Sequence, residues 1–212
     1  MEPCCFCPSP RKSLGENSGE VIAGYANPSI RPDDVSAFLH FVLGGSRSGK
    51  SRHAEALATA SGMPVCFVAT YATETVDEEM RARIVQHRNR RPSHWSTLED
   101  RFDLRNQVVE SENTLLLVDS VTLWLSYHLT QGRTPEAILA DLEETLQVAC
   151  KLGRALVLVS DEIGLAPVPA TREGRVFRDL CGSANQLIAR HATKVELLVA
   201  GLPLVLKGGG QA

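Results

Sequence analysis

The sequence predicts an α/β fold with a mostly parallel β-sheet and helices on both faces. From residue 38 onward, short apolar runs alternate with longer stretches whose apolar residues recur at helical spacing, the pattern of successive strand–helix–strand units. Between the first strand and the first helix, residues 44–51 read G-G-S-R-S-G-K-S and fit the phosphate-loop pattern G-x-x-x-x-G-K-[ST]. Together these observations predict a RecA-like P-loop NTPase domain, although they do not give the strand order.

Each element is predicted from its apolar pattern and its ends. Strands are expected at 38–43, 65–70, 114–119, 155–160, 195–200 and 204–206. Helices are expected at 50–60, 77–88, 121–129, 135–152 and 172–191. Pro135 suits the first turn of its helix because no amide hydrogen is needed there, and Thr134 suits the N-cap because its hydroxyl can accept an amide hydrogen bond.

Length and composition indicate one domain, which we place at residues 37–212 of the 212-residue chain. Residues 1–36 are punctuated by proline and glycine and are predicted to be a disordered extension. The formal net charge of −3 offers no general attraction to nucleic acid or to an anionic membrane. No apolar run reaches the roughly 18–20 residues that span a bilayer, and no secretory pattern opens the chain. These features favour a cytoplasmic protein.

The six cysteines divide into two groups. Cys66, Cys150 and Cys181 lie in apolar or helical context and are interpreted as small core residues. The other three cluster near the N-terminus: Cys4, Cys5 and Cys7. A metal site is one interpretation of that cluster, but it lacks the second pair of ligands that a closed zinc site needs, so a metal-free extension is favoured.

The phosphate loop supplies most of the predicted nucleotide contacts: Gly44, Gly45, Ser46, Arg47, Ser48, Gly49, Lys50 and Ser51. Its glycines let backbone N–H groups turn towards phosphates, and the following helix directs its positive end at them. Lys50 is predicted to reach the β- and γ-phosphates as a catalytic residue, and the Ser51 hydroxyl to bind Mg²⁺. Asp119 ends the third strand and is the predicted acidic partner of that Mg²⁺, with capping of the next helix as the alternative.

An arginine-rich segment carries a candidate nucleophile. Residues 81–95 read RARIVQHRNRRPSHW, and a solvated helix face is the usual interpretation of such a charge run. His87, however, lies near a helix end that Pro92 enforces, among Arg83, Arg88, Arg90 and Arg91. Their positive charges would keep the imidazole neutral and nucleophilic, and would offset the charge of a phosphate that it attacks.

The candidate segments are predicted to converge on one crevice. Thr70 and Tyr71 end the second strand, Asp119 ends the third, and Asp161 and Glu162 follow the fourth. Ligands of open α/β sheets bind at the carboxyl ends of the strands, so these side chains should meet the phosphate loop. Glu162 is predicted to act there as general base for a substrate hydroxyl, with capping of a turn as the alternative.

Four motifs occur together in this chain: G-G-S-R-S-G-K-S-R-H-A-E from residue 44, D-E-E-M-x-x-R-I-x-x-H ending at His87, R-P-x-x-W-x-T-x-E ending at Glu99, and V-F-R-D-L from residue 176. Over about residues 41–207 the chain resembles the bifunctional adenosylcobinamide kinase/adenosylcobinamide-phosphate guanylyltransferases of cobalamin biosynthesis. The resemblance implies that ATP or GTP, with Mg²⁺, phosphorylates the aminopropanol hydroxyl of adenosylcobinamide. It also implies that GMP then passes from GTP to that phosphate, with release of pyrophosphate.

The resemblance also implies roles for residues. It implies a histidine–GMP intermediate on His87, and GTP contacts from the phosphate loop and from Ala69, Thr70, Tyr71, Arg88, Asn89, Arg90, Arg91, Glu99 and Asp119. A carboxylate such as Glu99 could accept hydrogen bonds from guanine N1–H and N2–H₂ and so select GTP over ATP. The family is trimeric, which implies a homotrimer.

Two departures from the family pattern bear on the substrate. The family usually has Asn-Glu-Val-Gly where this chain has D-E-I-G at 161–164, and Val-Pro-Glu-Asn where it has V-P-A-T at 168–171. At Ala170 and Thr171 the Glu and Asn side chains of the family pattern are absent, and with them two polar groups that could contact the substrate or its phosphate; this bears on the kinase activity and the accepted corrinoid more than on guanylyl transfer. The rival functions are a kinase alone, a GTP-binding switch, against which no Asn-Lys-x-Asp motif occurs, and a nucleic-acid motor, which the acidic net charge disfavours.

Overall fold

The computed structural model describes residues 38–71 and 78–208, and in them one sheet has the strand order β3-β2-β4-β5-β1-β6-β7. The strands are β1 (Leu39–Gly44), β2 (Val65–Ala69), β3 (Ser96–Glu99), β4 (Leu115–Asp119), β5 (Leu156–Asp161), β6 (Lys194–Val199) and β7 (Leu202–Lys207). All neighbouring strands are parallel except β6 and β7, which form an antiparallel hairpin at one edge. The predicted mostly parallel sheet is confirmed.

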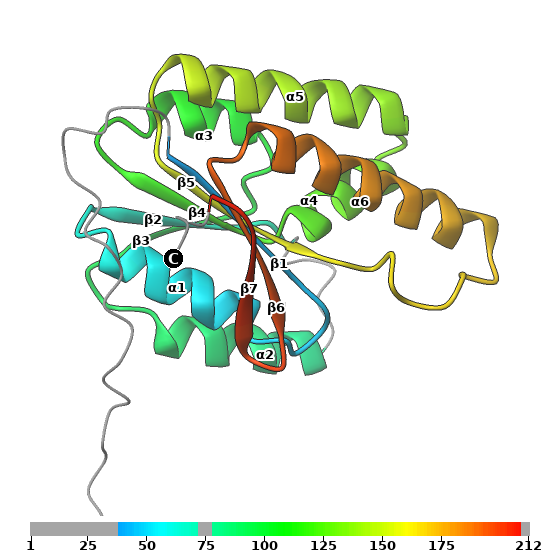
Figure 1. Ribbon diagram of the computed structural model, residues 1–212, viewed down its shortest axis with the longest axis horizontal. Coiled ribbons are helices and arrows are strands. Elements are labelled where there is room, and N and C mark those ends of the chain that lie inside the picture. Colours follow the sequence, from blue (N-terminus) through cyan, green and yellow to red (C-terminus); the bar gives the residue numbers. More distant parts are fainter. Residues whose placement is uncertain (1–37, 72–77, 209–212) are drawn as a thin grey trace, which may run out of the picture.

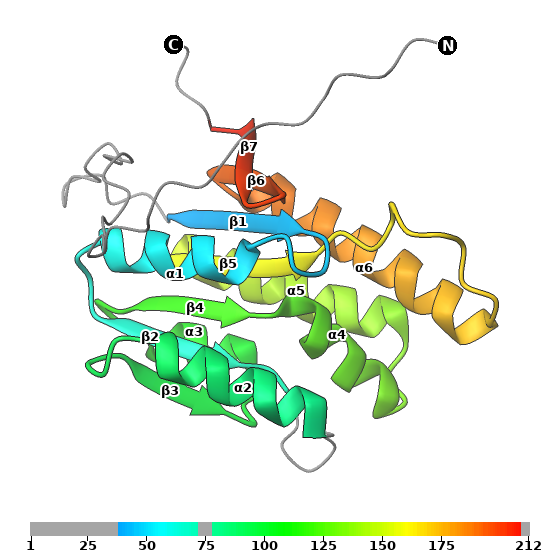
Figure 2. The same cartoon turned by 90° about the horizontal axis from the view of Figure 1, so that it is seen from below.

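The described helices cover both faces of this sheet. They are α1 (Lys50–Ala60), α2 (Glu78–Arg90), α3 (Leu104–Glu110), α4 (Val121–Thr130), α5 (Pro135–Lys151) and α6 (Arg172–His191). In Figure 1, α1 and α2 lie on one side of the sheet, and α3, α5 and α6 lie on the other. Figure 2 shows α4 beyond the end to which the β4 arrow points. None of these helices is both long and apolar enough to cross a bilayer.

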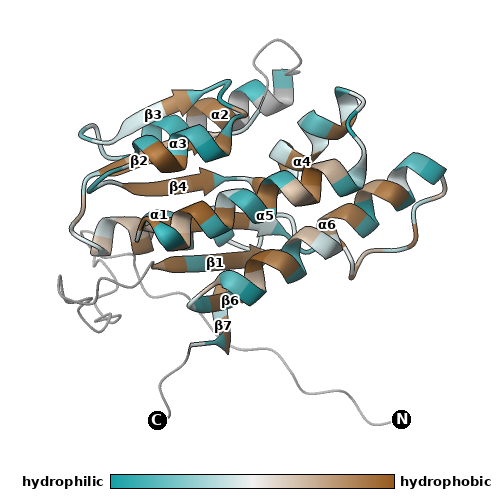
Figure 3. Cartoon of the chain, turned by 90° about the horizontal axis from the view of Figure 1, so that it is seen from above, coloured by the Kyte–Doolittle hydropathy of each residue, from teal (hydrophilic) through white to brown (hydrophobic). Residues whose placement is uncertain are grey.

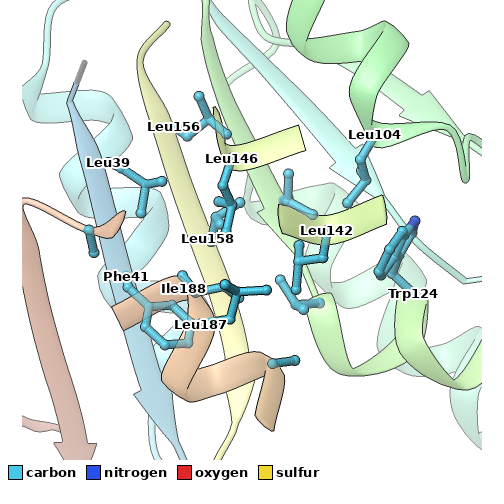
Figure 4. Close-up of a cluster of buried hydrophobic side chains, with 14 of the residues drawn as sticks. Leu39, Phe41, Leu104, Trp124, Leu142, Leu146, Leu156, Leu158, Leu187 and Ile188 are labelled. Carbon is cyan, nitrogen blue, oxygen red and sulfur yellow. The ribbon is translucent and has the colours of Figure 1, made fainter. Parts of the chain in front are cut away.

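Two clusters of buried side chains hold the layers together, one on each face. The larger cluster joins α3, α4, α5 and α6 to the sheet and includes Phe41, Trp124, Leu142 and Ile188, several of which meet in Figure 4. The smaller cluster lies under α1 and includes Phe67. Figure 3 shows the central strands as almost continuously hydrophobic, because a strand covered on both faces buries all its side chains.

Several boundaries differ from the sequence prediction. β3 and α3 were not predicted, because four and seven residues are too few to establish an apolar period. The predicted strand at 204–206 is the middle of β7. The predicted helix start at 77 and the extension at 1–36, with its three cysteines, lie outside the described residues. Cys66 and Cys181 are buried as predicted, but the prediction was wrong for Cys150, which is exposed on α5.

The helix ends follow from local hydrogen bonds. Thr134 accepts the Ala137 N–H at 3.3 Å, so its predicted N-cap role at α5 is confirmed. Thr171 caps α6 in the same way, accepting the Gly174 N–H at 3.1 Å. Thr171, which belongs to the second departure from the family pattern, therefore has a structural function in this chain.

Candidate functional site

The phosphate loop joins β1 to α1 at the edge of the sheet to which the parallel strands point (Figure 2). Gly49 is the N-cap of α1 with φ of 93°, a conformation that glycine adopts without steric cost. The Gly201 N–H donates to the Ser48 carbonyl at 2.9 Å, so the β6–β7 turn supports the loop. The Ser48 hydroxyl is buried and has no hydrogen-bond partner within the described residues, which fits a donor for a phosphate oxygen.

Lys50 points from the first turn of α1 to the end of β5. Its Nζ donates to the Gly45 carbonyl at 3.2 Å and lies 2.6 Å from Asp161 Oδ1. The backbone of Asp161 is held on both sides. Its N–H donates to Thr122 Oγ1 at 2.8 Å, and its carbonyl accepts from Asn185 Nδ2 at 3.1 Å. A carboxylate is thereby fixed next to the lysine that is expected to contact the transferred phosphate.

Glu162 follows Asp161 directly but makes a different contact. Its Oε1 accepts the Gly164 N–H at 2.9 Å, which is the turn-capping interaction considered as the alternative to general-base catalysis. Its own N–H donates to the Gly44 carbonyl at 3.1 Å, which keeps the residue at the edge that carries the phosphate loop. Asp161 had no predicted role, because two adjacent acidic residues at a strand end do not reveal which one faces the ligand.

Asp119 ends β4 close to Ser51, whose side chain favours the ionised carboxylate of Asp119. Burial raises the pKa of Asp119, while Ser51, His87 and Lys50 act in the opposite direction. The N-cap of α4 is Ser120, which accepts an amide of the first turn at 3.3 Å, so the capping alternative for Asp119 was wrong.

A hydroxyl beside a carboxylate suits Mg²⁺, which prefers oxygen ligands and usually keeps phosphate oxygens and water as further ligands. Ser51 and Asp119 therefore fit such an ion. Over 38–71 and 78–208, no three His, Cys, Asp or Glu side chains gather as a metal-binding group. An ion here would thus depend largely on the oxygens of the nucleotide.

Thr70 and Ala69 help to fix the positions of neighbouring residues of the site. The Thr70 hydroxyl accepts the Ser120 N–H at 2.9 Å and donates to the Ser120 carbonyl at 2.6 Å. Ala69 is opposite Asp119 on one side and Glu99 on the other. Both Ala69 and Thr70 are buried, so they set the positions of the acidic groups along the edge.

His87 lies in the last turn of α2 among charged groups from several elements. Arg90 Nη2 is 3.2 Å from His87 Nδ1 and 3.4 Å from Glu55 Oε1 of α1. Because a guanidinium only donates, Nδ1 is the acceptor and holds the lone pair of the neutral ring. Burial lowers the pKa of His87, the neighbouring arginines and Lys50 lower it further, and Asp119 opposes them. The imidazole is therefore held in its neutral form.

Glu99 accepts two hydrogen bonds at the end of β3. The Tyr71 hydroxyl donates to its Oε1 at 2.7 Å, and Arg88 donates to the same oxygen. Burial and the bond to Glu99 raise the pKa of Tyr71 to about 12. Burial alone would raise the pKa of Glu99, but the bonds from Tyr71 and Arg88 outweigh it and lower that pKa. Glu99 is thus an oriented carboxylate in its ionised form.

Arg91 stacks on an aromatic ring instead of pairing with an acid. Its Cζ lies 3.4 Å from the centroid of Phe67, and burial lowers the pKa of Arg91. Its Nε and Nη1 are buried without hydrogen-bond partners in the part of the chain that the structure describes. Buried guanidinium donors of this kind suit phosphate oxygens. Three other predicted contacts are exposed at the rim: Ser46, Arg47 and Asn89.

Besides Asp161, two further residues of the site had no role in the sequence prediction. Glu55 pairs with Arg90 and burial raises its pKa, and Phe67 supports Arg91. Glu55 ends the quoted motif at the phosphate loop, so its position was a usable signal. Phe67 gave no signal, because an aromatic residue in an apolar strand is normally interpreted as core.

A phosphate loop at the carboxyl edge of a parallel sheet, with a serine–aspartate pair and a neutral histidine beside it, defines a P-loop nucleotide-binding enzyme. Residues 40–206 match the family described as cobinamide kinase / cobinamide phosphate guanyltransferase. The chain belongs to this family, and the family suggested by its motifs is confirmed.

The comparisons also identify individual relatives. The chain is 43% identical over 169 residues to the bifunctional adenosylcobalamin biosynthesis protein CobP of Pseudomonas aeruginosa, covering 79% of this chain and 96% of that protein. It is 35% identical over 181 residues to CobU of Escherichia coli, which carries the same description, covering 78% and 98%. Among solved structures, the flagellar accessory protein FlaH from Methanocaldococcus jannaschii is similar with a TM-score of 0.46 and 14% identity, covering 84% of this chain and 83% of that one.

Proposed function

We propose that this protein phosphorylates adenosylcobinamide with ATP or GTP and then transfers GMP from GTP to adenosylcobinamide phosphate. The shared description of its relatives as bifunctional adenosylcobalamin biosynthesis proteins supports the pair of activities. The observation that carries the proposal is the imidazole of His87, whose Nδ1 accepts from Arg90 Nη2 at 3.2 Å and whose pKa is lowered by burial, close enough to Asp119 and Lys50 for their charges to act on it. A kinase acting alone would need no nucleophile there.

In the kinase step, the phosphate loop binds the triphosphate and Lys50 contacts its β- and γ-phosphates. A carboxylate at the end of β5 accepts the proton of the aminopropanol hydroxyl as that oxygen bonds to the γ-phosphorus and the bond to the β-phosphate breaks. Glu162 is the proposed base. Ser51 and Asp119 would hold Mg²⁺, which supplies positive charge to offset that of the triphosphate.

In the guanylyl step, the neutral imidazole of His87 attacks the α-phosphorus of GTP. A nitrogen–phosphorus bond forms as the bond to the β-phosphate breaks, and pyrophosphate leaves. Arg90 and Arg91 offset the charge on the transferring group. An oxygen of adenosylcobinamide phosphate then attacks the same phosphorus, the nitrogen–phosphorus bond breaks, and adenosylcobinamide-GDP leaves with His87 restored.

Glu99 is the proposed determinant of guanine selection. Tyr71 and Arg88 both donate to Oε1, which orients the carboxylate so that it can accept from guanine N1–H and N2–H₂. Adenine presents no matching pair of donors. The test is the nucleotide preference of Glu99→Gln, which should lose discrimination between GTP and ATP; an unchanged preference would contradict the assignment.

Mass spectrometry of the intact protein after incubation with GTP tests the covalent step. We expect a GMP adduct on the wild type and on His94→Ala, a matched control in which an exposed histidine of the same segment is removed, but none on His87→Ala. A wild type that phosphorylates adenosylcobinamide without forming an adduct would be a kinase alone. A wild type that binds GTP but modifies neither itself nor adenosylcobinamide would support the GTP-binding switch.

A homotrimeric assembly and a cytoplasmic location are also part of the proposal. The resemblance to a trimeric family supports the assembly, and so does the apolar edge strand β7, where Leu202, Leu204 and Leu206 are 71%, 55% and 55% exposed. Exposed apolar edges of this kind favour association. Light scattering should give the mass of three chains, and a monomeric mass would contradict the proposal.

A further inference from the structure

A groove on the helical face that carries α3 and α5 has no role in the reactions described above. Its volume is about 680 Å³, and its lining residues come from α3, α4, α5 and the segments that join them. This volume falls within the roughly 300–1,000 Å³ of typical small-molecule sites. We call it the α3–α5 groove; its lining includes Phe102, Trp124, Tyr127, His128 and Arg133.

Two lining residues of the groove closely follow residues of the nucleotide site in the sequence. Phe102 is three residues beyond Glu99, and Trp124 is five residues beyond Asp119. At about 1.5 Å of rise per helical residue, Trp124 lies only roughly 6 Å along α4 from its cap at Ser120. Thr122, in the same first turn, holds the backbone of Asp161 at 2.8 Å. The short helix α4 therefore connects the phosphate edge with the groove.

Two aromatic residues of the groove lining are stacked on each other. The rings of Phe102 and Tyr127 are stacked with centroids 3.4 Å apart and an interplanar angle of 8°. Trp124 Nε1 donates to the Phe102 carbonyl at 2.6 Å, which joins the two elements. Trp124 also lies close to Leu104 of α3 (Figure 4). Phe102 and Tyr127 are half-buried, so their stacked rings contribute some apolar surface to a lining that also carries polar groups.

The polar groups of the groove balance one another in charge. Arg133 Nη1 donates to Asp141 at 2.8 Å and lies 3.3 Å from His128 Nδ1, and burial lowers the pKa of His128. Arg105 pairs with Glu144 at 3.0 Å. The charged lining residues are two arginines, at 105 and 133, and two aspartates, at 103 and 141. Such a lining does not select phosphate, in contrast to the loop that follows β1.

The remaining polar lining suits amides. Asn106 and Gln131 contribute primary amide side chains, which can both donate and accept hydrogen bonds; Asn106 Nδ2 already donates to Glu110 Oε1 at 3.0 Å, so its carbonyl oxygen is the group it offers to a ligand. From this combination we infer that the α3–α5 groove binds the amide-bearing macrocycle of adenosylcobinamide, while its aminopropanol arm extends along α4 to the phosphate edge. The inference rests on the proposed function, because it assigns a position to the second substrate of that site.

Binding of adenosylcobinamide by the full-length protein tests the inference. Val109 lines the groove and is 46% exposed, so Val109→Trp adds bulk there with little risk to folding; Leu152, 42% exposed at the end of α5 and outside the lining, provides the matched control Leu152→Trp. We expect Val109→Trp to raise both the Kd and the KM for adenosylcobinamide by at least about tenfold, and Leu152→Trp to leave them within about twofold. GMP adduct formation on His87, which needs no corrinoid, should stay unchanged in both.

Tyr127→Ala gives a second measurement, because it removes the stacked wall rather than filling the space, and it should also raise the KM. Unchanged Kd and KM for adenosylcobinamide in both groove variants would overturn the inference. So would a loss of GMP adduct formation as large as the loss of adenosylcobinamide binding, because such a loss indicates general damage to the protein. If the wild type binds adenosylcobinamide and Val109→Trp weakens that binding, but the wild type transfers neither phosphate nor GMP, only the proposed function is refuted. A wild type that does not bind adenosylcobinamide would refute both.

Discussion

Alanine at Gly44 would place a methyl group where the phosphate loop has no room. A Cβ at this position lies 2.3 Å from Ser48 Oγ and 3.0 Å from the Leu198 carbonyl oxygen. The Leu198 oxygen belongs to the backbone of β6, which pairs with β1 along its length, so it cannot rotate away. Ser48 is part of the loop itself. We therefore expect Gly44→Ala to displace the loop from its position.

The magnitude follows from the cost of overpacking. Inserting a methyl group into a closely packed site costs about 1–3 kcal/mol. For a chain of this size, each kcal/mol lowers Tm by roughly 2–4 °C, so Tm should fall by about 2–12 °C. If the variant keeps its stability and only the geometry of the phosphate loop changes, the same free-energy cost appears in nucleotide binding and raises the Kd for GTP by roughly 5- to 150-fold.

Thermal unfolding without nucleotide and calorimetric titration with GTP measure the two effects. Gly45→Ala is the matched control for unfolding, because a Cβ at Gly45 meets nothing within 4 Å, and its Tm should match the wild type. Equal Tm values for the two variants, together with an unchanged Kd for GTP in Gly44→Ala, would refute the steric reasoning.

Three further predictions concern charge. Because burial lowers the pKa of His87, the rate of GMP adduct formation should be independent of pH until the pH falls below the ordinary histidine value of about 6.5. Arg90→Ala removes a neighbouring cation, so in a single-turnover pH profile its rate should begin to fall at a higher pH than that of the wild type. Arg91→Lys keeps the charge but loses the stacking on Phe67, and we expect titration to show a Kd for GTP about tenfold higher. Glu196 is buried and bonded to two histidines and a lysine, which lower its pKa. Urea unfolding at pH 7 should therefore show Glu196→Gln to be about 3–5 kcal/mol less stable than the wild type. This difference in stability should shrink as the pH falls below the carboxyl pKa of the unfolded chain, about 4.3, because a depressed carboxyl pKa contributes its full stabilisation only above that value.

Local patterns in the chain were sufficient for much of the architecture. The phosphate loop, the five longer helices and the parallel character of the sheet follow from contiguous residues whose spacing repeats. The N-cap at Thr134 was predictable because a cap and its helix are neighbours in the sequence. The candidate role of His87 was also suggested locally, by the arginines around it. Short elements such as β3 and α3 were missed because they contain no more than about two periods of any pattern.

Contacts between distant residues required the fold. Lys50 meets Asp161 rather than Glu162, and this choice depends on how β5 lies beside β1, not on either segment alone. Arg91, one residue beyond the end of α2, stacks on Phe67 of β2, and neither segment alone reveals this contact. The strand order, and the groove between α3, α4 and α5, likewise depend on packing between segments far apart in the chain. Spacing along a chain encodes which face of an element is apolar, whereas the partner of that face is chosen by the free energy of the whole packed arrangement.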